Sequence, residues 1–463
     1  MTFTTFGAIF GLAVSIFLII WKFHPVYSLV LGALIGGIIG GGGLAGTVDT
    51  MISGAQGMMS SVLRILTSGI LAGALIKTGS AEKIAEMIVK KMGERFAILS
   101  IAISTMIICA VGVFVDISVI TVAPIAMAIA KRAGYNKPSI LLAMIGGGKA
   151  GNIISPNPNT IATAEAFQID LTSLMMKNIL PAIGALLVTI VLATFLTKRS
   201  DDMISENDLE KAEHKKLPSF TTAIAGPLLV ILLLALRPLF QIAIDPLIAL
   251  PAGGILCMLA TGQIKNIKSY VEFGLSKVIG VSILLIGTGT LAGIIKASNL
   301  QFDMISLLEA GNLPAFLLAP ISGILMAGAT ASTTAGATIA SQTFASTLIS
   351  SGVDAVSAGA MVHSGATVID SMPHGSFFHA TGGSVNMQMK ERMKLIPYEA
   401  CVGITSTILS TMIFFLHFYL HRCKIKCWLK PEIRTVFSGF IVSTSVHKGE
   451  PLYEKFIQTM EQH

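Results

Sequence analysis

The chain has 463 residues, of which 53% are hydrophobic and only 12% are charged, and its mean hydropathy is +0.77. This composition excludes a water-soluble domain and indicates an all-α polytopic membrane protein. The net charge of +7 does not by itself imply an anionic partner such as nucleic acid, because Lys and Arg gather in the cytoplasmic loops of membrane proteins. The five cysteines lack disulfide or metal-ligand spacing, so we expect no metal site and no cofactor.

The predicted membrane spans each approach or exceed the roughly 17 to 25 residues that cross a bilayer. In chain order they are Phe3–Trp21, Val26–Leu44, Met58–Ile76, Leu174–Thr197, Thr221–Phe240, Pro246–Thr261, Phe273–Ile295 and Ile396–Leu420. The first lacks a basic start and a small-residue cleavage site, so we expect a retained helix and not a signal peptide. A multi-pass protein of the cell membrane, the inner membrane in bacteria, is therefore expected.

Between the third and fourth spans, the apolar segment Ala97 to Ala130 has Gly112-Val-Phe-Val-Asp116 near its middle. The segments before and after it, 79–95 and 131–137, are both rich in Lys and Arg. The positive-inside rule places both flanks in the cytoplasm, so the chain should enter the membrane and return. We predict a re-entrant helical hairpin with its tip near the bilayer midplane.

The next segment, Gly146 to Asn159, is Gly-Gly-Gly-Lys-Ala-Gly-Asn-Ile-Ile-Ser-Pro-Asn-Pro-Asn. Glycine lowers helix stability and proline removes a backbone donor, so we expect no continuous helix through this run. Unwound backbone at membrane depth is tolerated only where it lines a polar cavity, which predicts a broken transmembrane helix and a binding site.

A polar linker, Lys198 to Ser219, separates two comparable halves. Met144, Gly148 and Pro156 recur at one constant offset as Met361, Gly365 and Pro373, which indicates an internal duplication. The predicted organisation is therefore a first membrane repeat at 1–197, a cytoplasmic linker at 198–219, a second repeat at 220–421 and a polar tail at 422–463, to which we assign no function.

The second half offers a counterpart for each feature of the first. Pro314 to Ser350 is a second hairpin that turns near Gly328, and residues 363–383 form a second broken helix. The segment 79–95 is rich in basic residues, whereas its counterpart in the second half, 298–313, carries acidic residues instead. The positive-inside rule therefore places equivalent loops of the two halves on opposite faces of the membrane. We predict an inverted repeat of two halves, each with a re-entrant hairpin and a broken transmembrane helix, as in secondary transporters.

These motifs resemble those of the gluconate permease family, within the ion-transporter superfamily of elevator-type carriers. The resemblance covers about residues 60–420. It rests on Phe114-Val-Asp-Ile-Ser-Val-Ile-Thr-Val-Ala-Pro124, on Ser155-Pro-Asn-Pro-Asn159, where Ser155 stands in place of a family histidine, and on Asp370-Ser-Met-Pro-His-Gly-Ser-Phe-Phe378. It implies a symporter for gluconate or a related small hydroxy-acid or amino-acid anion, usually coupled to protons, with sodium as the alternative coupling ion. A homodimer is one possible assembly.

Three residues are candidates for proton coupling: Asp116, Asp370 and His374. A carboxylate at a midplane hairpin tip costs at least about 2.5 to 3.5 kcal/mol on insertion scales, so Asp116 is expected to have a role that offsets this cost. A structural aspartate that caps the second hairpin helix is the alternative. Asp370 has His363, His374 and His379 nearby in sequence, which either share its proton or fill a polar turn.

Lys149 is the candidate anchor for a substrate carboxylate. The alternatives are an ion pair with Asp116 or Asp370, or snorkelling to the interface. Neutral hydrogen-bonding groups from the two breaks and hairpin tips are the other predicted substrate-binding residues, although some of them will only cap helices. They are Asn152, Ser155, Asn157, Asn159, Ser118, Thr330, Ser332, Thr333 and Ser371.

Two other function classes compete with a symporter. A membrane-embedded enzyme would use Asp116 and Asp370 as paired carboxylates, but it would not need an inverted duplication, so we predict that the protein is not an enzyme. A channel or a cation/proton exchanger of the same architecture is the stronger alternative. Arg64, inside an apolar span, is expected to be a paired structural charge, and Gly40 to Gly43 lack the Gly-Lys-Ser/Thr of a phosphate loop.

Overall fold

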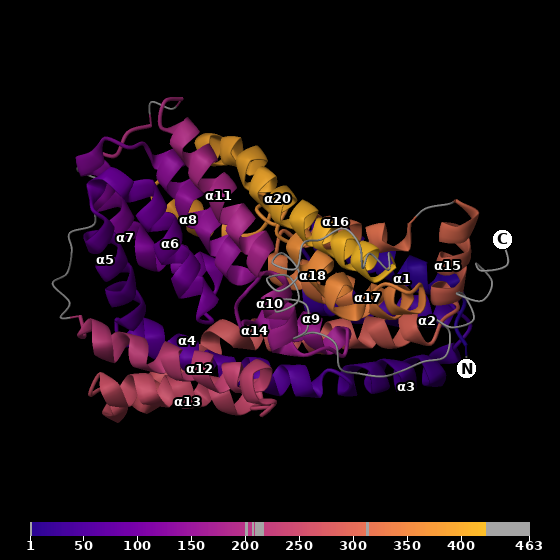
Figure 1. Cartoon of the computed structure of the whole chain (residues 1–463). Helices are drawn as coiled ribbons and strands as arrows, with labels where there is room; N and C mark the ends of the chain where they lie inside the picture. Colours follow the sequence, from indigo (N-terminus) through magenta and orange to yellow (C-terminus); the bar gives the residue numbers. More distant parts are fainter. Residues whose placement is uncertain (1, 200–201, 206–207, 209–216, 312–313, 423–463) are drawn as a thin grey trace. The chain divides into compact units, whose positions relative to one another are not determined.

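The computed structural model describes residues 2–199, 202–205, 208, 217–311 and 314–422, and it divides the chain into two units, Met1–Phe415 and Leu416–His463. The described chain is helical apart from turns and two isolated bridges (Figure 1). The predicted tail at 423–463 lies outside the described residues.

The elements up to the linker are α1 (Thr5–Ile20), α2 (Pro25–Ile39), α3 (Gly43–Gln56), α4 (Met59–Lys77), α5 (Ser80–Met92), α6 (Ala97–Ala110), α7 (Val115–Ala133), α8 (Lys137–Asn152), α9 (Pro158–Ala166), α10 (Leu171–Lys177) and α11 (Ile179–Leu196). After the linker come α12 (Phe220–Phe240), α13 (Pro246–Ala260), α14 (Ile267–Lys296), α15 (Leu300–Ala310), α16 (Leu318–Thr330), α17 (Thr333–Ser350), α18 (Ala355–Gly365), α19 (Ser376–Gly383) and α20 (Met389–Arg422).

Five helices in the described chain are long and apolar enough to cross a membrane, or up to six if a bent pair counts as one span. The five correspond to α4, α11, α12, α14 and α20. The predicted spans at 3–21, 26–44 and 246–261 form shorter apolar helices. The helix in the second of these spans is shorter than predicted because α2 ends at Ile39, where the chain turns through Gly41 and Gly43, both with positive φ.

Both predicted hairpins are present as pairs of helices. In the first, α6 and α7 are joined by a turn in which Gly112 has φ 109°. In the second, α16 and α17 are joined through Ala331, with φ 48°. Their re-entry into the membrane from one side stays a prediction.

The first break is shorter than the sequence indicates. Helix α8 continues through Gly146-Gly147-Gly148 and ends only at Asn152, and unwound chain spans residues 153–157. A Cβ atom on Gly147 would lie 2.1 Å from the Ala102 carbonyl oxygen, and one on Gly151 would lie 2.3 Å from that of Met106. These glycines therefore allow α8 to pack closely against α6, and the break begins only as the chain approaches Pro156.

The order of elements in the first half is repeated in the second. The series α4, α5, hairpin α6–α7, α8, break, α9 is followed after the linker by α14, α15, hairpin α16–α17, α18, break, α19. The second break spans residues 366–375, a narrower range than the predicted 363–383. This succession agrees with a duplication, and the opposite orientation of the two halves in the membrane stays a prediction.

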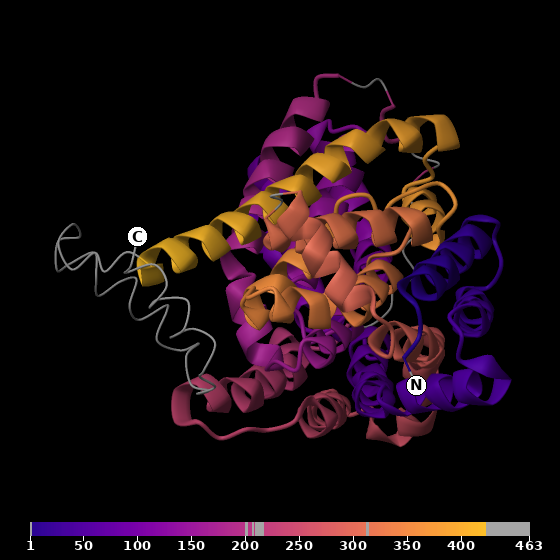
Figure 2. The same ribbon diagram turned by 90° about the vertical axis from the view of Figure 1, so that its right-hand side faces the viewer.

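The two halves interlock in their packing. One hydrophobic core joins α4 to α8 with α12 and α13 of the second half, and another joins α1 and α2 with α14 to α18. Figure 2 shows the indigo α1–α2 pair beside the second-half helices. The described helices on either side of the predicted linker at 198–219 therefore do not form separate units of packing.

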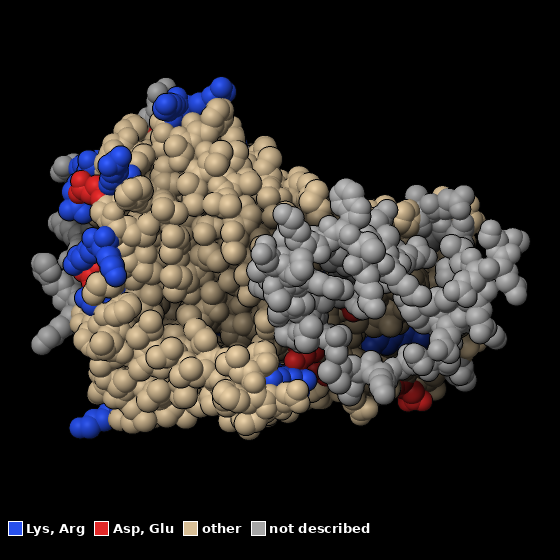
Figure 3. All heavy atoms as spheres, in the orientation of Figure 1, with Lys and Arg blue, Asp and Glu red and all other residues tan. Residues whose placement is uncertain are grey.

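The described part of the linker is fixed to the start of α8. The Lys137 ammonium group lies 2.9 Å from Asp208 and 3.8 Å from Asp202. Burial raises the pKa of Asp208, but hydrogen bonds from Ser205 and Lys137 outweigh it and lower the pKa to about 2. Figure 3 shows Lys and Arg side chains gathered beside α5 and α7 and a broad uncharged surface over α6, α8 and α11. The membrane-facing surface is expected to include that uncharged face.

Helices α4 and α14 cross at glycines, and this crossing supplies a first prediction. A Cβ atom on Gly274 would lie 1.9 Å from the Gly69 carbonyl oxygen, so Gly274→Ala should overpack the crossing and lower the free energy of unfolding by about 1 to 3 kcal/mol. The measurement is the thermal unfolding midpoint of the purified protein in detergent.

Gly280 on the same helix is the matched control, because a Cβ atom there would meet nothing within 4 Å. Gly280→Ala should leave the midpoint unchanged or raise it, since Ala is favoured over Gly in helices by about 1 kcal/mol. Equal midpoints for the two variants would show that the crossing tolerates a wider separation than the structure has.

Candidate functional site

The two breaks meet at one buried ion pair. Lys149 lies in the last turn of α8, and Asp370 lies in the unwound segment between α18 and α19. The Lys149 Nζ atom is 2.7 Å from Asp370 Oδ1, and the two side chains are 2% and 3% exposed. Lys149 also donates to the Thr367 carbonyl oxygen at 2.7 Å. Of the alternatives for Lys149, the structure has the ion pair with Asp370.

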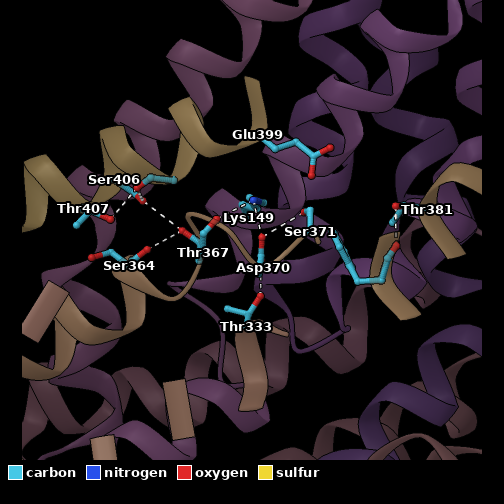
Figure 4. Close-up of polar contacts among 12 residues, drawn as sticks. Lys149, Thr333, Ser364, Thr367, Asp370, Ser371, Thr381, Glu399, Ser406 and Thr407 are labelled. Atoms are coloured by element: carbon cyan, nitrogen blue, oxygen red, sulfur yellow. Dashed lines mark hydrogen bonds and ion pairs between the residues drawn. The ribbon is translucent and has the colours of Figure 1, made fainter. Parts of the chain in front are cut away.

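Two hydroxyl groups complete the surroundings of the Asp370 carboxylate (Figure 4). Thr333, the first residue of α17, donates to Oδ2 at 2.5 Å, and Ser371 donates to Oδ1 at 3.2 Å. A buried charge pair is tolerated only when its remaining hydrogen-bonding positions are filled. The second hairpin tip, the second break and α8 of the first half therefore converge on one polar centre, which we call the Lys149–Asp370 centre.

Three asparagines in and beside the first break form a second polar group. The Asn157 Nδ2 atom donates to the side chain of Asn152 at 2.5 Å, and Asn159 Nδ2 donates to the same Oδ1 atom at 3.0 Å. Asn157 Oδ1 accepts from the backbone N–H groups of Asn159 and Thr160, which caps α9. Asn152 Nδ2, Ser155 Oγ and Asn159 Oδ1 are buried without a partner in the described chain, so they remain available to a ligand.

Among the described residues, no hydrogen bond or ion pair joins Asp116 or Ser118 of the first hairpin tip to the Lys149–Asp370 centre, although Val115 of that tip packs against Gly148 beside Lys149. Asp116 lies in the first turn of α7, where its carboxylate interacts with the backbone N–H of Ile117 and with the charge of Lys277. Ser118 donates to the Phe114 carbonyl oxygen of its own helix at 2.8 Å. The structure therefore gives Asp116 and Ser118 partners other than the remaining predicted site residues.

Three further predicted residues hold the second hairpin tip. Thr330 donates to the Met326 carbonyl oxygen at 2.8 Å, and the Ser332 side chain caps α17. His374 is exposed, and its Nε2 atom lies 3.3 Å from the Ala329 carbonyl oxygen. Thr330 and Ser332 thus stabilise the turn of the hairpin itself, and His374 connects the tip to the second break. A contact with bound substrate stays a prediction for each of them.

One buried charge pair was not predicted from the sequence. Arg392 and Glu399 of α20 form an ion pair, and each side chain is 1% exposed. Arg392 also donates to Thr381 Oγ1 at 3.2 Å and lies 4.7 Å from the centre of the Phe378 ring. The sequence feature that could have indicated this pair is the presence of opposite charges on either side of Pro397, where a predicted span begins.

Arg64 is paired, as expected for a charge inside an apolar span. It forms ion pairs with Glu165 at the end of α9 and with Asp245 at the start of α13, the latter at 2.9 Å. Ser60 donates to Glu165 at 2.8 Å. In the described residues, no group of three or more His, Cys, Asp or Glu side chains is placed to hold a metal ion.

Comparison with known families decides what kind of protein has this arrangement. A profile of the GntP permease family matches residues 3–252. The chain belongs to the GntP permease family. The resemblance to gluconate permeases is therefore confirmed, as is the prediction of a transporter and not an enzyme. This member is a multi-pass protein of the cell membrane.

Individual relatives range widely in similarity. An "Uncharacterized transporter" of Haemophilus influenzae is 55% identical over 89% of this chain and 98% of its own length. The D-serine transporter DsdX of Escherichia coli is 21% identical over 70% of this chain and 79% of its own. The high-affinity gluconate transporter of Escherichia coli is 24% identical over 48% of this chain and 50% of its own.

Two solved structures share the fold. The Alcanivorax borkumensis YdaH transporter has a TM-score of 0.62 at 14% identity, covering 88% of this chain and 98% of that one. Neisseria gonorrhoeae MtrF has a TM-score of 0.58 at 13% identity, covering 86% and 94%. At these identities the similarity is one of fold, and it confirms the all-helical transporter architecture.

The Arg392–Glu399 pair yields a prediction about stability. Glu399→Gln leaves the Arg392 charge buried without its partner, so it should lower the free energy of unfolding by about 3 to 5 kcal/mol. Arg392→Met combined with Glu399→Leu removes both charges and should restore most of the loss. The measurement is the unfolding midpoint in detergent.

The exposed Glu391–Lys394 pair of the same helix provides the control. Glu391→Gln should change stability by no more than about 1 kcal/mol, because exposed ion pairs contribute little. A midpoint for Glu399→Gln as high as that of Glu391→Gln would exclude a structural role for the buried pair.

Proposed function

We propose that the protein is a proton-coupled symporter for a small hydroxy-acid or amino-acid anion. The family membership supports a permease, and gluconate and D-serine are the substrates named for two relatives. The observation that most directly supports an anionic substrate and proton coupling is the Lys149–Asp370 pair.

The pair links carboxylate binding to proton binding through electrostatics. A substrate carboxylate that approaches Lys149 would compete with the Asp370 carboxylate for the same ammonium group. Two ionised carboxylates beside one buried cation leave a net negative charge, and like charges favour protonation of one of the acids. A protonated Asp370 would keep Thr333 and Ser371 as hydrogen-bond partners while Lys149 takes the substrate. Binding of the anion and of one proton would then favour each other.

Neutral groups beside the centre suit the rest of such a substrate. Asn152, Ser155 and Asn159 each have a buried polar atom without a partner, and a polar atom left unpaired in this way costs about 1 to 3 kcal/mol. Substrate hydroxyl or amino groups would satisfy them. In this proposal Asp116 is a second proton-binding site, at the tip of the other hairpin.

Uptake into proteoliposomes tests the proposal. With an inward proton gradient, labelled gluconate or D-serine should accumulate above its external concentration and saturate with substrate. Vesicles with an inward sodium gradient, or with no gradient, should only equilibrate.

Each other result excludes part of the proposal. Accumulation driven only by sodium would exclude proton coupling. A flux that does not saturate would indicate a channel, and proton-linked cation movement without any organic acid would indicate an exchanger.

Replacement of Asp370 should separate coupling from binding. In Asp370→Asn, the side chain keeps its shape but cannot exchange a proton, so proton-driven accumulation should fall at least tenfold while exchange of internal for external substrate continues. The measurement compares net uptake with counterflow in the same vesicles.

Asp116→Asn distinguishes the two candidate carboxylates in the same assay. Loss of accumulation in Asp116→Asn with normal accumulation in Asp370→Asn would move the coupling site to the first hairpin. Glu86→Gln, which alters a carboxylate paired with Lys83 and Lys90 near the surface, should leave both activities unchanged.

A further inference from the structure

A cavity of about 490 Å³ lies apart from the Lys149–Asp370 centre. Its walls come from α3, α14, α17, the end of α9 and the turn after it, and they include Thr50, Glu165, Gln168, Lys296 and Gln342. A volume of several hundred Å³ is typical of small-molecule sites. The cavity therefore has room for a small organic ligand.

Gln342 of α17 is the most unusual residue of the cavity wall. Its side chain is 1% exposed, and neither its amide nitrogen nor its amide oxygen has a hydrogen-bond partner in the described structure. A buried amide that lacks both partners is unfavourable, and such groups in native proteins are commonly completed by a ligand or ordered water. Gln342 thus offers one donor and one acceptor to an occupant of the cavity.

A cation lies on the same cavity. Lys296 is in the last turn of α14, exposed, and without an ion pair in the described chain. The carboxylate on the cavity wall, Glu165, is already occupied by Arg64 and Ser60. A carboxylate ligand would therefore find a free cation, whereas an ammonium group would find no free anion.

The geometry of α17 makes this a separate site. Gln342 follows Thr333, which contacts Asp370, by nine positions. At 1.5 Å rise and 100° per residue this places it about 14 Å along the helix and roughly 180° around it. One ligand small enough for the Lys149–Asp370 centre cannot reach both faces of α17.

We propose that this cavity binds a small hydroxylated carboxylate, with Lys296 taking the carboxylate group and Gln342 a hydroxyl group. The cavity ligand belongs to the same chemical class as the proposed transport substrate, and for this choice of ligand the proposal rests on the proposed function. The site differs in that it favours hydroxy acids over amino-acid zwitterions.

The experiment measures equilibrium binding of gluconate and of serine to the purified full-length protein in detergent. The background variant is Lys149→Gln with Asp370→Asn, which neutralises the centre without leaving one buried charge alone. It should retain gluconate binding. Adding Gln342→Leu or Lys296→Gln should weaken that remaining binding at least tenfold, and serine should bind the background variant at least tenfold more weakly than gluconate.

Two control substitutions in the same background should leave the remaining binding unchanged. They are Thr343→Val on α17 and Lys268→Gln on α14, neither of which lines the cavity. Equal unfolding midpoints would show that the cavity variants are folded.

Loss of all gluconate binding in the background variant would overturn the cavity site, as would remaining binding that is insensitive to Gln342→Leu and Lys296→Gln. Either result leaves the proposed function standing. Failure of wild-type vesicles to accumulate gluconate or D-serine would instead count against the proposed function, because binding at the cavity is measured without transport.

Discussion

A charge or an unwound backbone inside a membrane must find its partners within the protein, and this constraint organises the centre of the molecule. Helix α8 of the first half brings a lysine inward, and the second half supplies a carboxylate and a backbone carbonyl as its partners, with two hydroxyl groups that donate to the same carboxylate. Removing one member of such a buried pair costs about 3 to 5 kcal/mol. The pair therefore joins the two halves at the candidate site.

Close helix packing determines where the chain can unwind. The small residues of α8 bring its backbone against α6, so the helix is held by its neighbours as far as Asn152 in spite of its glycines. Only Pro156, which has no N–H group to bond back to this helix, interrupts it, and Pro158 then begins α9. This limits the unwound segment to residues 153–157, where Asn157 replaces a missing helical partner by capping α9.

Local sequence patterns were sufficient to predict the hairpins and the breaks, but not the residues that form ion pairs across the fold. The hairpins were predictable because Gly112 and the turn after Gly328 interrupt apolar runs, and the breaks because prolines stand in them. The predicted extent of the first break was wrong, because the low helix propensity of glycine takes no account of the tertiary packing that stabilises α8. Several alternatives stayed open for Lys149 because its partner lies more than two hundred positions away. The opposite charges of Arg392 and Glu399 stand close together in the sequence, but charge pattern alone does not show that both side chains are buried.

The ion pairs differ in burial, and this bears on how the proposed transport cycle could proceed. Arg64 and Arg237 join the α9–α10 region to α4, α12 and α13 through pairs whose side chains are between 20% and 49% exposed. These pairs are partly open to solvent, so water can replace them more readily than it can replace a fully buried pair when the helices move. The buried pairs at Lys149 and Arg392 cannot be hydrated in this way. Movement of α9 relative to α4 is therefore opposed less by its ion pairs than is opening of the Lys149–Asp370 centre. In the proposed cycle, a substrate carboxylate and a proton take the place of the contact that is broken there.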